Sequence, residues 1–594
     1  MWALLVACAK VAPLPGMTAD DVAAGVHDPA LASLIRESWE LGLDEDPVRG
    51  TALGDHRRDA RWPDPSSEAQ ADGAQRRENL LVRLSALSLA EGRDRETAAL
   101  LSSSLLAAVE RGICRSETWV VGVRFHPGNA LSDLATAHPM VEGQGAKDLA
   151  VRIRAFPSYV DAIVAGWRRG LAEGRVASRT GIERAASQLD GVVSSEVGTW
   201  ELGAAIQSAP ELSDATRTAL LTELDGPVRA ALGRAAATLR NELMPAGRVG
   251  REEGVGSLPD GADCYAANVR THTTLNGTPA EIHALGLTEL AAIHAEMRQI
   301  GARAFGTDDL AEILHRLRTD LTLRFTDEAD VEREAVRAVA AAETALRPYF
   351  HTWPATPVRV ERVPAHDAPW STIAWYRQPV PGPDAVGAYV VNTSAPETRA
   401  RYEAAALAFH EAVPGHHTQI AWAQELGAMP AFRRHDYVSA FAEGWALYAE
   451  RLAAEAGLMR DDLDRLGVAS FDAWRASRLV VDTGLHSMGW TREEAVAFML
   501  DNTALAEANV VNEVDRYVSW PGQALGYKVG QVELRTLRAE AEATLGARFD
   551  IRDFHDVVLG GGAVTLPVLR ERVSTWVAAG GGRWSDVARA APTL

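Results

Sequence analysis

The chain has 594 residues, 47% of them hydrophobic and 24% charged, so it is long enough to bury a large core. Its formal net charge is −20, with acidic residues scattered among arginines, which indicates a solvated surface. That charge argues against nucleic acid as a partner, because phosphate binding requires a basic face. Apolar residues recur at helical spacing in most windows, so we expect a mainly α protein with one large helical body.

The N-terminus carries a short apolar run that ends in Leu5-Val6-Ala7-Cys8. This tetrad resembles the site at which bacterial lipoproteins are cleaved and lipidated on cysteine. The run is short for a signal peptide and lacks a preceding basic residue, which a start codon assigned too late would explain. We therefore expect residues 1–30 to be a leader or tether, with Cys8 lipid-anchored in the bacterial cell envelope or periplasm. If these residues are only a frayed end, the protein is cytoplasmic.

The remaining cysteines, Cys114 and Cys264, form no CxxC pair, which excludes a zinc site built on thiolates. They can form one disulfide in an exported protein, or remain two buried thiols. The sequence leaves both alternatives open.

We expect residues 31–594 to form a single helical domain with lobes at roughly 31–245 and 264–594. Between the lobes, residues 245–263 are rich in glycine and are predicted to form a surface loop. A helix is expected over Thr278–Ala304, because Thr278, Pro279 and Glu281 provide an N-terminal capping pattern.

The helical pattern is interrupted at residues 351–396, where short β-like runs predict a small hairpin or sheet. The run that contains Tyr389 and ends at Asn392 would be an edge strand that pairs with an extended peptide, or else part of a plain hairpin. We therefore assign Tyr389 and Asn392 as candidate substrate-binding residues.

Helices resume at Glu397 and lead into His410-Glu411-Ala412-Val413-Pro414-Gly415-His416-His417. A helix that ends in His-Glu is typical of zinc peptidases, in which the histidine binds the metal and the glutamate acts as base. Pro414 cannot donate a helical hydrogen bond, so the helix is expected to break after Glu411. Gly415 is expected to adopt a positive φ and to reverse the chain. Such a break would bring a second histidine back toward His410.

Either His416 or His417 can be that second ligand, and the other would then hydrogen-bond near the metal. His417 begins the apolar stripe of the following helix, which predicts that it packs inward. We therefore favour His416 as the ligand and keep His417 as the alternative.

Glu443 is expected to be the third ligand, because it lies among apolar residues in Phe441-Ala442-Glu443-Gly444-Trp445. A buried carboxylate is costly unless it is paired or bound to a metal, and a buried ion pair with an arginine such as Arg478 is the rival interpretation. The mid-helix Gly444 indicates a close approach of another backbone.

Arg478, Asp482 and His486 follow at helical spacing, which places them on one face as a predicted polar wall of the substrate groove. Arg478 is thus a candidate substrate-binding residue. His486 is a candidate donor to the negative charge that develops on the substrate.

These motifs resemble a bacterial family catalogued as domain of unknown function 885, many of whose members are lipoproteins. The resemblance rests on the His-Glu-x-x-Pro-Gly-His-His motif and the Glu-Gly-Trp-Ala-Leu-Tyr motif that starts at Glu443, and it extends over most of the chain. The order His-Glu, His and then Glu on the next helix is more distantly similar to helical gluzincins such as angiotensin-converting enzyme and thermostable carboxypeptidases. That similarity implies a deep groove between two lobes, one zinc ion per chain, and an oxyanion-stabilising role for Tyr527.

The sequence therefore predicts zinc-dependent hydrolysis of peptide bonds, with Glu411 as general base and Tyr527 and His486 as donors. One alternative is a zinc-dependent amidase that acts on a small or modified amino-acid substrate. Another is a binding lipoprotein in which zinc is only a structural staple, although a purely structural site does not need Glu411. The oligomeric state stays open.

Overall fold

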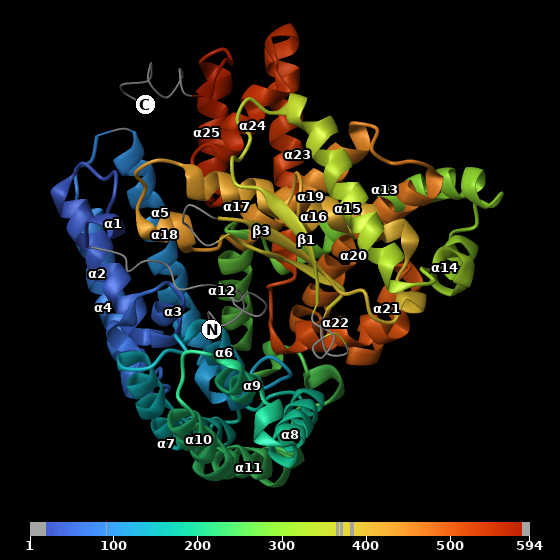
Figure 1. Cartoon of the computed structure of the whole chain (residues 1–594). Helices are drawn as coiled ribbons and strands as arrows, with labels where there is room; N and C mark the ends of the chain where they lie inside the picture. The colour runs from blue at the N-terminus through green and yellow to red at the C-terminus, as the bar shows by residue number, and fades with distance from the viewer. Residues whose placement is uncertain (1–18, 91, 364–367, 369–371, 380–384, 585–594) are drawn as a thin grey trace.

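The computed structural model describes residues 19–584, except 91, 364–367, 369–371 and 380–384. The predicted lipidation site at Cys8 lies outside these residues. The prediction of a mainly α protein is confirmed, because the structure is 72% helical with one small sheet. Figure 1 shows the N-terminal helices as an arc along the left and lower sides, with the rest of the chain at the upper right.

The arc contains two hydrophobic cores. The first helices pack around Leu34, Leu43 and Leu80 and also enclose Ala431 from a distant part of the chain. The later helices pack around Phe156 and Leu232. The helices of the arc are α1 (Ala19–Val22), α2 (Pro29–Glu45), α3 (Pro47–Ala52), α4 (Ser67–Ser85), α5 (Arg93–Glu110), α6 (Pro127–Ala137), α7 (Gln144–Ala172), α8 (Arg179–Ser194), α9 (Glu201–Ser208), α10 (Asp214–Glu223) and α11 (Arg229–Thr238).

The segment Arg93–Cys114, which contains α5, is long and apolar enough by composition to cross a membrane. In the folded chain its Leu101 and Leu105 are buried in the first core of the arc. Glu96 of the same helix accepts hydrogen bonds from the guanidinium groups of Arg433 and Arg572. This segment is therefore an integral part of the fold.

The glycine-rich connection at residues 245–263 is exposed over much of its length, as predicted, but its centre packs against the second part of the chain. Val255 is fully buried. A Cβ on Gly254 would lie 1.8 Å from the carbonyl oxygen of Leu485, so only glycine allows this approach to the end of α20 (Asp462–Ser487). Arg248 donates hydrogen bonds to the carbonyl oxygens of Glu253 and Gly254, which fixes the connection.

The second part of the chain surrounds the largest core, in which Phe409, Phe441 and Trp445 are buried. The predicted capping box at Thr278 and Glu281 is present at the start of α13. The remaining helices are α12 (Gly261–Thr273), α13 (Pro279–Ala304), α14 (Leu310–Thr319), α15 (Glu328–Leu346), α16 (Ala404–Glu411), α17 (His416–Glu425), α18 (Ala431–His435), α19 (Ser439–Glu455), α21 (Arg492–Asn502), α22 (Glu507–Ser519), α23 (Leu525–Leu545), α24 (Ile551–Leu559) and α25 (Leu566–Ala578).

The predicted small sheet precedes α16 and has three strands in the order β1-β3-β2. β3 (Gly387–Val391) lies in the centre, parallel to β1 (Val358–Arg362) and antiparallel to β2 (Ala374–Arg377). The prediction that the run containing Tyr389 is an edge strand is therefore wrong. The run is buried along its whole length, which matches its apolar composition.

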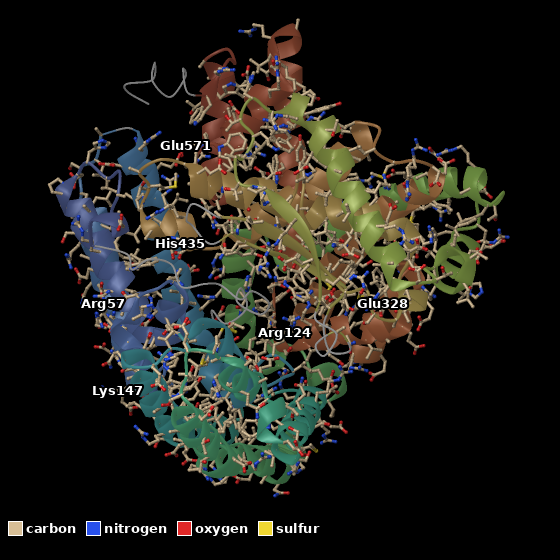
Figure 2. The ribbon with its side chains drawn as sticks, in the orientation of Figure 1. Arg57, Arg124, Lys147, Glu328, His435 and Glu571 are labelled. Carbon is tan, nitrogen blue, oxygen red and sulfur yellow. A yellow bond between two sulfur atoms is a disulfide. The ribbon has the colours of Figure 1, made fainter. Side chains whose placement is uncertain are left out.

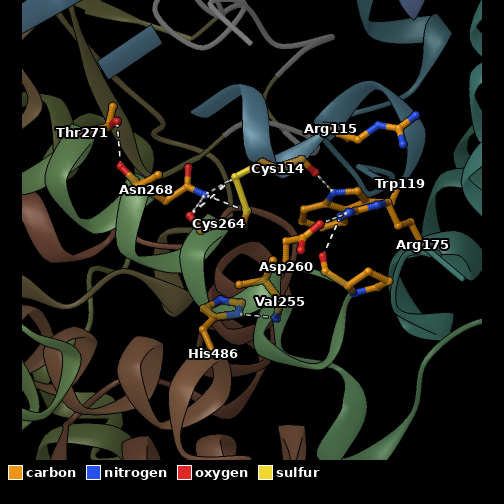
Figure 3. The surroundings of a disulfide bond; sticks show 12 residues. Cys114, Arg115, Trp119, Arg175, Val255, Asp260, Cys264, Asn268, Thr271 and His486 are labelled. Atoms are coloured by element: carbon orange, nitrogen blue, oxygen red, sulfur yellow. Dashed lines mark hydrogen bonds and ion pairs between the residues drawn. A yellow bond between two sulfur atoms is a disulfide. The ribbon is translucent and has the colours of Figure 1, made fainter. Parts of the chain in front are cut away.

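Cys114 and Cys264 form a disulfide, which resolves the alternative that the sequence left open. The bridge joins the short 3-10 helix η2 (Arg111–Cys114) at the end of α5 to α12, as Figure 3 shows. Asn268, one turn further along α12, donates a hydrogen bond to the carbonyl oxygen of Cys264 beside the bridge. The arc and the second part of the chain are thus covalently linked near the centre of the molecule.

Candidate metal centre

Two histidines and one glutamate converge on a single point. His410 Nε2 lies 3.6 Å and His416 Nε2 lies 3.5 Å from the same oxygen of Glu443, Oε2. One ligand atom from each of the three residues lies within 4.8 Å of the others, and all three side chains are buried. Glu443 Oε2 has no hydrogen-bond partner, so the donor set and its geometry fit a divalent metal such as zinc.

The helix break that creates this geometry occurs where the sequence predicts it. α16 ends at Glu411 and α17 begins at His416, so the chain folds back between the two histidines. Gly415 has a φ of −74°, so the expectation of a positive φ is wrong. Glycine is needed for steric reasons, because a Cβ there would lie 1.9 Å from the carbonyl oxygen of His410. Trp445 holds the turn by donating a hydrogen bond from Nε1 to the Pro414 carbonyl oxygen, at 2.8 Å.

Glu443 is positioned by the close crossing of α19 and α23. A Cβ on Gly444 would lie 2.5 Å from the backbone of Gly530, which confirms that Gly444 permits a close backbone approach. The Tyr437 hydroxyl donates a hydrogen bond to Glu443 Oε1 at 2.5 Å, which leaves Oε2 directed at the histidines. Glu443 makes no ion pair with Arg478, whose guanidinium pairs with Glu513 instead.

A second glutamate of α19 orients His410. Its ring donates a hydrogen bond from Nδ1 to Glu450 Oε1 at 2.8 Å, which directs Nε2 toward Glu443. Burial lowers the pKa of His410, but the surrounding Glu443, Glu450 and Glu411 outweigh it and raise the pKa to about 9. The same three carboxylates that favour a proton on His410 would favour a metal cation at the cluster.

His417 lies outside the cluster, because both of its ring nitrogens are already hydrogen-bonded. Nδ1 accepts from the Tyr376 hydroxyl at 3.0 Å, and Nε2 donates to the carbonyl oxygen of Thr356 at 3.1 Å. Burial lowers the pKa of His417 to about 4, so the ring is neutral at physiological pH. The structure thus places His416, and not His417, beside His410 and Glu443.

The two histidines are expected to respond differently to substitution. His416→Ala should abolish stoichiometric zinc binding, because it removes one of the three converging groups. His417→Ala should keep zinc bound with an affinity reduced by at most about 10- to 100-fold, the usual effect of groups outside the ligand set. Zinc titration of both variants with a competing chelator measures this. Metal loss in the His417 variant alone would reverse the assignment.

Glu411 lies next to the cluster and lines the cavity. Burial raises the pKa of Glu411 above its usual value, and the charges of His410 and His416 offset only part of this increase. Its carboxylate is not part of the converging set, so it is free to exchange protons with a small molecule bound beside the cluster.

Tyr527 also lines the cavity, from the first turn of α23. Burial and the charge of Glu443 raise the pKa of its hydroxyl, so it stays protonated and can donate a hydrogen bond. Arg478 lies behind it, with the guanidinium carbon 4.2 Å from the centre of the Tyr527 ring. Arg478 is buried among Tyr517, Glu513 and Trp474 and does not line the cavity, so its assignment as a substrate-binding residue is wrong. It packs against the ring of Tyr527 instead.

His486 is not brought to the cluster, and its predicted role as a donor to substrate is wrong. Its Nδ1 accepts a hydrogen bond from the Val255 backbone (Figure 3). Its Nε2 donates to the carbonyl oxygen of Tyr517. Asp482, on the same face of α20, accepts from the Tyr265 hydroxyl at 2.6 Å and from the Gly522 backbone. This face joins neighbouring segments instead of forming a groove wall.

Tyr389 and Asn392 do not contact the cavity, so their assignment as substrate-binding residues is wrong. Both side chains are 1% exposed. Asn392 donates a hydrogen bond to the carbonyl oxygen of Ala368, within the sheet region. The strand that reaches the cavity is β2, through Trp375 and Tyr376. A period-two pattern identifies a strand but does not reveal its neighbours.

The cluster opens into a cavity of about 1310 Å³ between the arc and the second part of the chain. One wall consists of α2 to α7, and the other consists of β2, α16 to α19 and α23. His435 of α18, labelled in Figure 2, contributes to the junction, where its ring centre lies 6.5 Å from that of Trp39. The cavity matches the predicted groove between two lobes.

Another group of possible ligands in the described part of the chain is His351, Asp550 and Asp553. His351 is already paired with Asp553 at 2.9 Å and accepts a hydrogen bond from Arg583. Asp550 caps the N-terminus of α24. The groups of this second set are thus engaged in other interactions, and the His410 cluster is the better candidate.

Two groups of the site were not predicted from the sequence. Glu450 lies two turns after Glu443 on α19, a spacing that places both carboxylates on one helix face. Tyr437 precedes α19, and no sequence pattern connects its hydroxyl with Glu443. The helix spacing could have revealed Glu450, whereas Tyr437 required the fold.

Fold and site together define a mainly helical protein in which two histidines and a glutamate converge at a large central cavity. The chain belongs to the family described as bacterial proteins of unknown function (DUF885), whose model matches residues 47–573. This confirms the family resemblance seen in the sequence. No curated protein was found to match the chain.

Two solved structures share the fold. A candidate lipoprotein from Colwellia psychrerythraea is 25% identical, with 92% of this chain and 99% of that chain covered and a TM-score of 0.85. A candidate lipoprotein of unknown function from Shewanella oneidensis is 18% identical, with 91% and 98% of the two chains covered and a TM-score of 0.71. The similarity therefore extends through both parts of the molecule.

Proposed function

We propose that the protein is a zinc-dependent hydrolase of peptide bonds. The observation that carries this proposal is the convergence of His410 Nε2, His416 Nε2 and the unpartnered Glu443 Oε2 beside Glu411. Three protein ligands with an open side are typical of catalytic zinc sites, and zinc in such a site polarises a water molecule and a carbonyl group. A purely structural site would be closed by a fourth protein ligand.

The residues around the cluster have separable tasks. Glu411, whose pKa is raised by burial, takes a proton from the attacking water and returns it to the leaving amine. Tyr527 donates a hydrogen bond to the carbonyl oxygen as negative charge develops on it. Tyr437 and Glu450 fix the orientations of Glu443 and His410.

A peptide fits the cavity better than a small amide does. The volume of about 1310 Å³ exceeds what a single modified amino acid would fill. β2 is an edge strand, and it lines the cavity with Trp375 and Tyr376, so an extended peptide could pair with it.

We further propose that the protein acts in the bacterial cell envelope. The related structures are described as candidate lipoproteins, and the Cys114–Cys264 disulfide is typical of proteins outside the cytoplasm. Lipidation of Cys8 would anchor the chain there, with the helical domain following a tether.

Hydrolysis of a mixed peptide pool, read by mass spectrometry, tests the proposed activity. We expect the zinc-loaded protein to cleave peptides, a chelator to stop cleavage, and added zinc to restore it. Hydrolysis confined to a parallel panel of N-acyl amino acids would favour the amidase alternative. Zinc-loaded protein that cleaves neither pool would contradict the proposal and favour a zinc-stapled binding protein.

A further inference from the structure

One guanidinium on the cavity wall lacks a partner. Arg111, the first residue of η2, lines the same cavity as Glu411, Glu443 and Tyr527. Its Nε is buried and has no hydrogen-bond partner, and no ion pair involves this side chain among the described residues. Burial and the nearby Arg77 lower the pKa of Arg111 to about 10, so it remains charged at neutral pH. Arg111 is half-buried, and an unpaired charge with a buried, unsatisfied Nε is costly, which indicates a missing anion.

Several other arginines on this wall differ from Arg111 because their charges are paired with carboxylates. Arg115 pairs with Glu173 at 2.6 Å, and Arg433 pairs with Glu96 at 2.5 Å. Arg77 pairs with Glu45, and Arg434 donates a hydrogen bond to the carbonyl oxygen of Asp21. Among the described residues, Arg111 thus differs from Arg77, Arg115 and Arg433 in that it has no carboxylate partner, and from Arg434 in that its side chain makes no hydrogen bond.

Two further polar groups without partners are found on the elements that adjoin Arg111 and the cluster, His272 on α12 and Ser439 on α19. His272 Nε2 is buried and unpartnered, and burial together with the charge of Arg111 lowers the pKa of His272 to about 3. The Ser439 hydroxyl is also buried without a partner. A Cβ on Gly526 would lie 2.9 Å from both the Ser439 hydroxyl and the His272 carbonyl oxygen, so these two residues meet beside Tyr527.

Ser439 connects this region to the cluster. It lies one helical turn before Glu443 on α19, which corresponds to about 6 Å along the helix axis. The neutral imidazole of His272 can donate from Nε2, the Ser439 hydroxyl can donate, and Arg111 supplies a charged donor. Because the charge of Arg111 acts on His272, and His272 meets Ser439 at Gly526, these three donors form a connected set that can serve an anionic group near the cluster.

Arg111 is held rigidly. The preceding residue, Glu110, pairs with Arg270 of α12 at 2.8 Å. Three residues later, the Cys114–Cys264 disulfide fixes the other end of η2 to the same helix (Figure 3). Leu101, Leu105 and Ala108 of α5 lead along the cavity wall to Arg111 at helical spacing and provide an apolar path.

We propose that Arg111, with Ser439 and His272, forms a subsite for the free C-terminal carboxylate of a peptide. This inference rests on the proposed peptidase function, and it makes the protein an exopeptidase that releases a short C-terminal piece. Arg binds a carboxylate through two parallel N–H···O bonds to its two oxygens. An amidated C-terminus is neutral and has only one acceptor oxygen, so it cannot form this pair.

The test uses the Glu411→Gln protein, so that binding is measured without turnover. A pool of random tetrapeptides, prepared as free acids and as C-terminal amides, is incubated with the zinc-loaded protein, and retained peptides are quantified by mass spectrometry after ultrafiltration. We expect free acids to be retained about 10- to 100-fold better than amides, as a charge-assisted bond implies. Adding Arg111→Gln should bring this ratio to about one, and Arg111→Lys should restore part of it.

Arg115→Gln is the matched control, because Arg115 lies on the same wall with its charge paired, and it should keep the preference for acids. Arg111→Gln should melt at the wild-type temperature, since no partner is lost.

Equal retention of acids and amides, a preference that survives Arg111→Gln, or no retention at all would overturn the subsite. Peptide cleavage by the wild-type protein is measured separately, so cleavage without an acid preference rejects only the subsite. An Arg111-dependent preference without cleavage rejects only the proposed activity.

Discussion

Glu411→Gln is expected to lower kcat for peptide hydrolysis by about 10²- to 10⁴-fold, with zinc content and melting temperature unchanged. Glutamine keeps the size of the side chain but cannot accept a proton. Glu411 does not belong to the converging set, so the metal should stay bound. Steady-state kinetics on a cleaved peptide, together with elemental analysis, measure both effects.

Glu403→Gln provides the control for this substitution. Burial raises the pKa of Glu403 to about 7, as it raises that of Glu411, but Glu403 accepts a hydrogen bond from Ser470 away from the cavity. The control variant should retain wild-type kcat. If Glu411→Gln turns over at close to the wild-type rate, another group is the base.

Glu443→Gln is expected to lose zinc, with affinity reduced well beyond the 10- to 100-fold of a group outside the ligand set. A bound ligand stabilises the folded state by about 4 kcal/mol when its concentration is 1,000 times Kd, so zinc should raise the melting temperature of the wild type. The Glu443 variant should show little or none of this increase. Isothermal titration and thermal melting, each with and without zinc, provide the measurement.

Glu450→Gln serves as the comparison, because Glu450 contacts His410 Nδ1 and lies outside the converging set. It should weaken zinc binding by about 10- to 100-fold and keep part of the thermal shift. Unchanged zinc affinity in Glu443→Gln would reassign Glu443 to a hydrogen-bond acceptor for Tyr437.

The features predicted correctly from the sequence depend on local rules. Pro414 breaks α16 where a missing N–H requires it, and Thr278 with Glu281 caps α13. The placement of His416 with His410 follows from that break. Gly444 is a further example. A glycine inside a helix predicts a close backbone approach, and in the structure α19 crosses α23 at this position.

The incorrect predictions concern which other segments a helix face or a strand contacts. Helical spacing correctly places Arg478 and His486 on one side of α20, but their partners are Tyr517, Glu513 and the backbone of Val255, from distant segments. The strand containing Tyr389 was identified, whereas its central place depended on pairing with β1 and β2. Long-range packing of this kind leaves no periodic signal in the sequence.

The central claim is that His410, His416 and Glu443 hold one zinc ion, and the most direct test is crystallographic. Protein purified without chelator is analysed for metals, and diffraction data are collected on both sides of the zinc absorption edge. The account predicts about one zinc per chain and a single anomalous peak within roughly 2.0–2.2 Å of His410 Nε2, His416 Nε2 and a Glu443 oxygen. Protein that contains no stoichiometric metal and does not bind added zinc would contradict the account, as would an anomalous peak at a different set of residues.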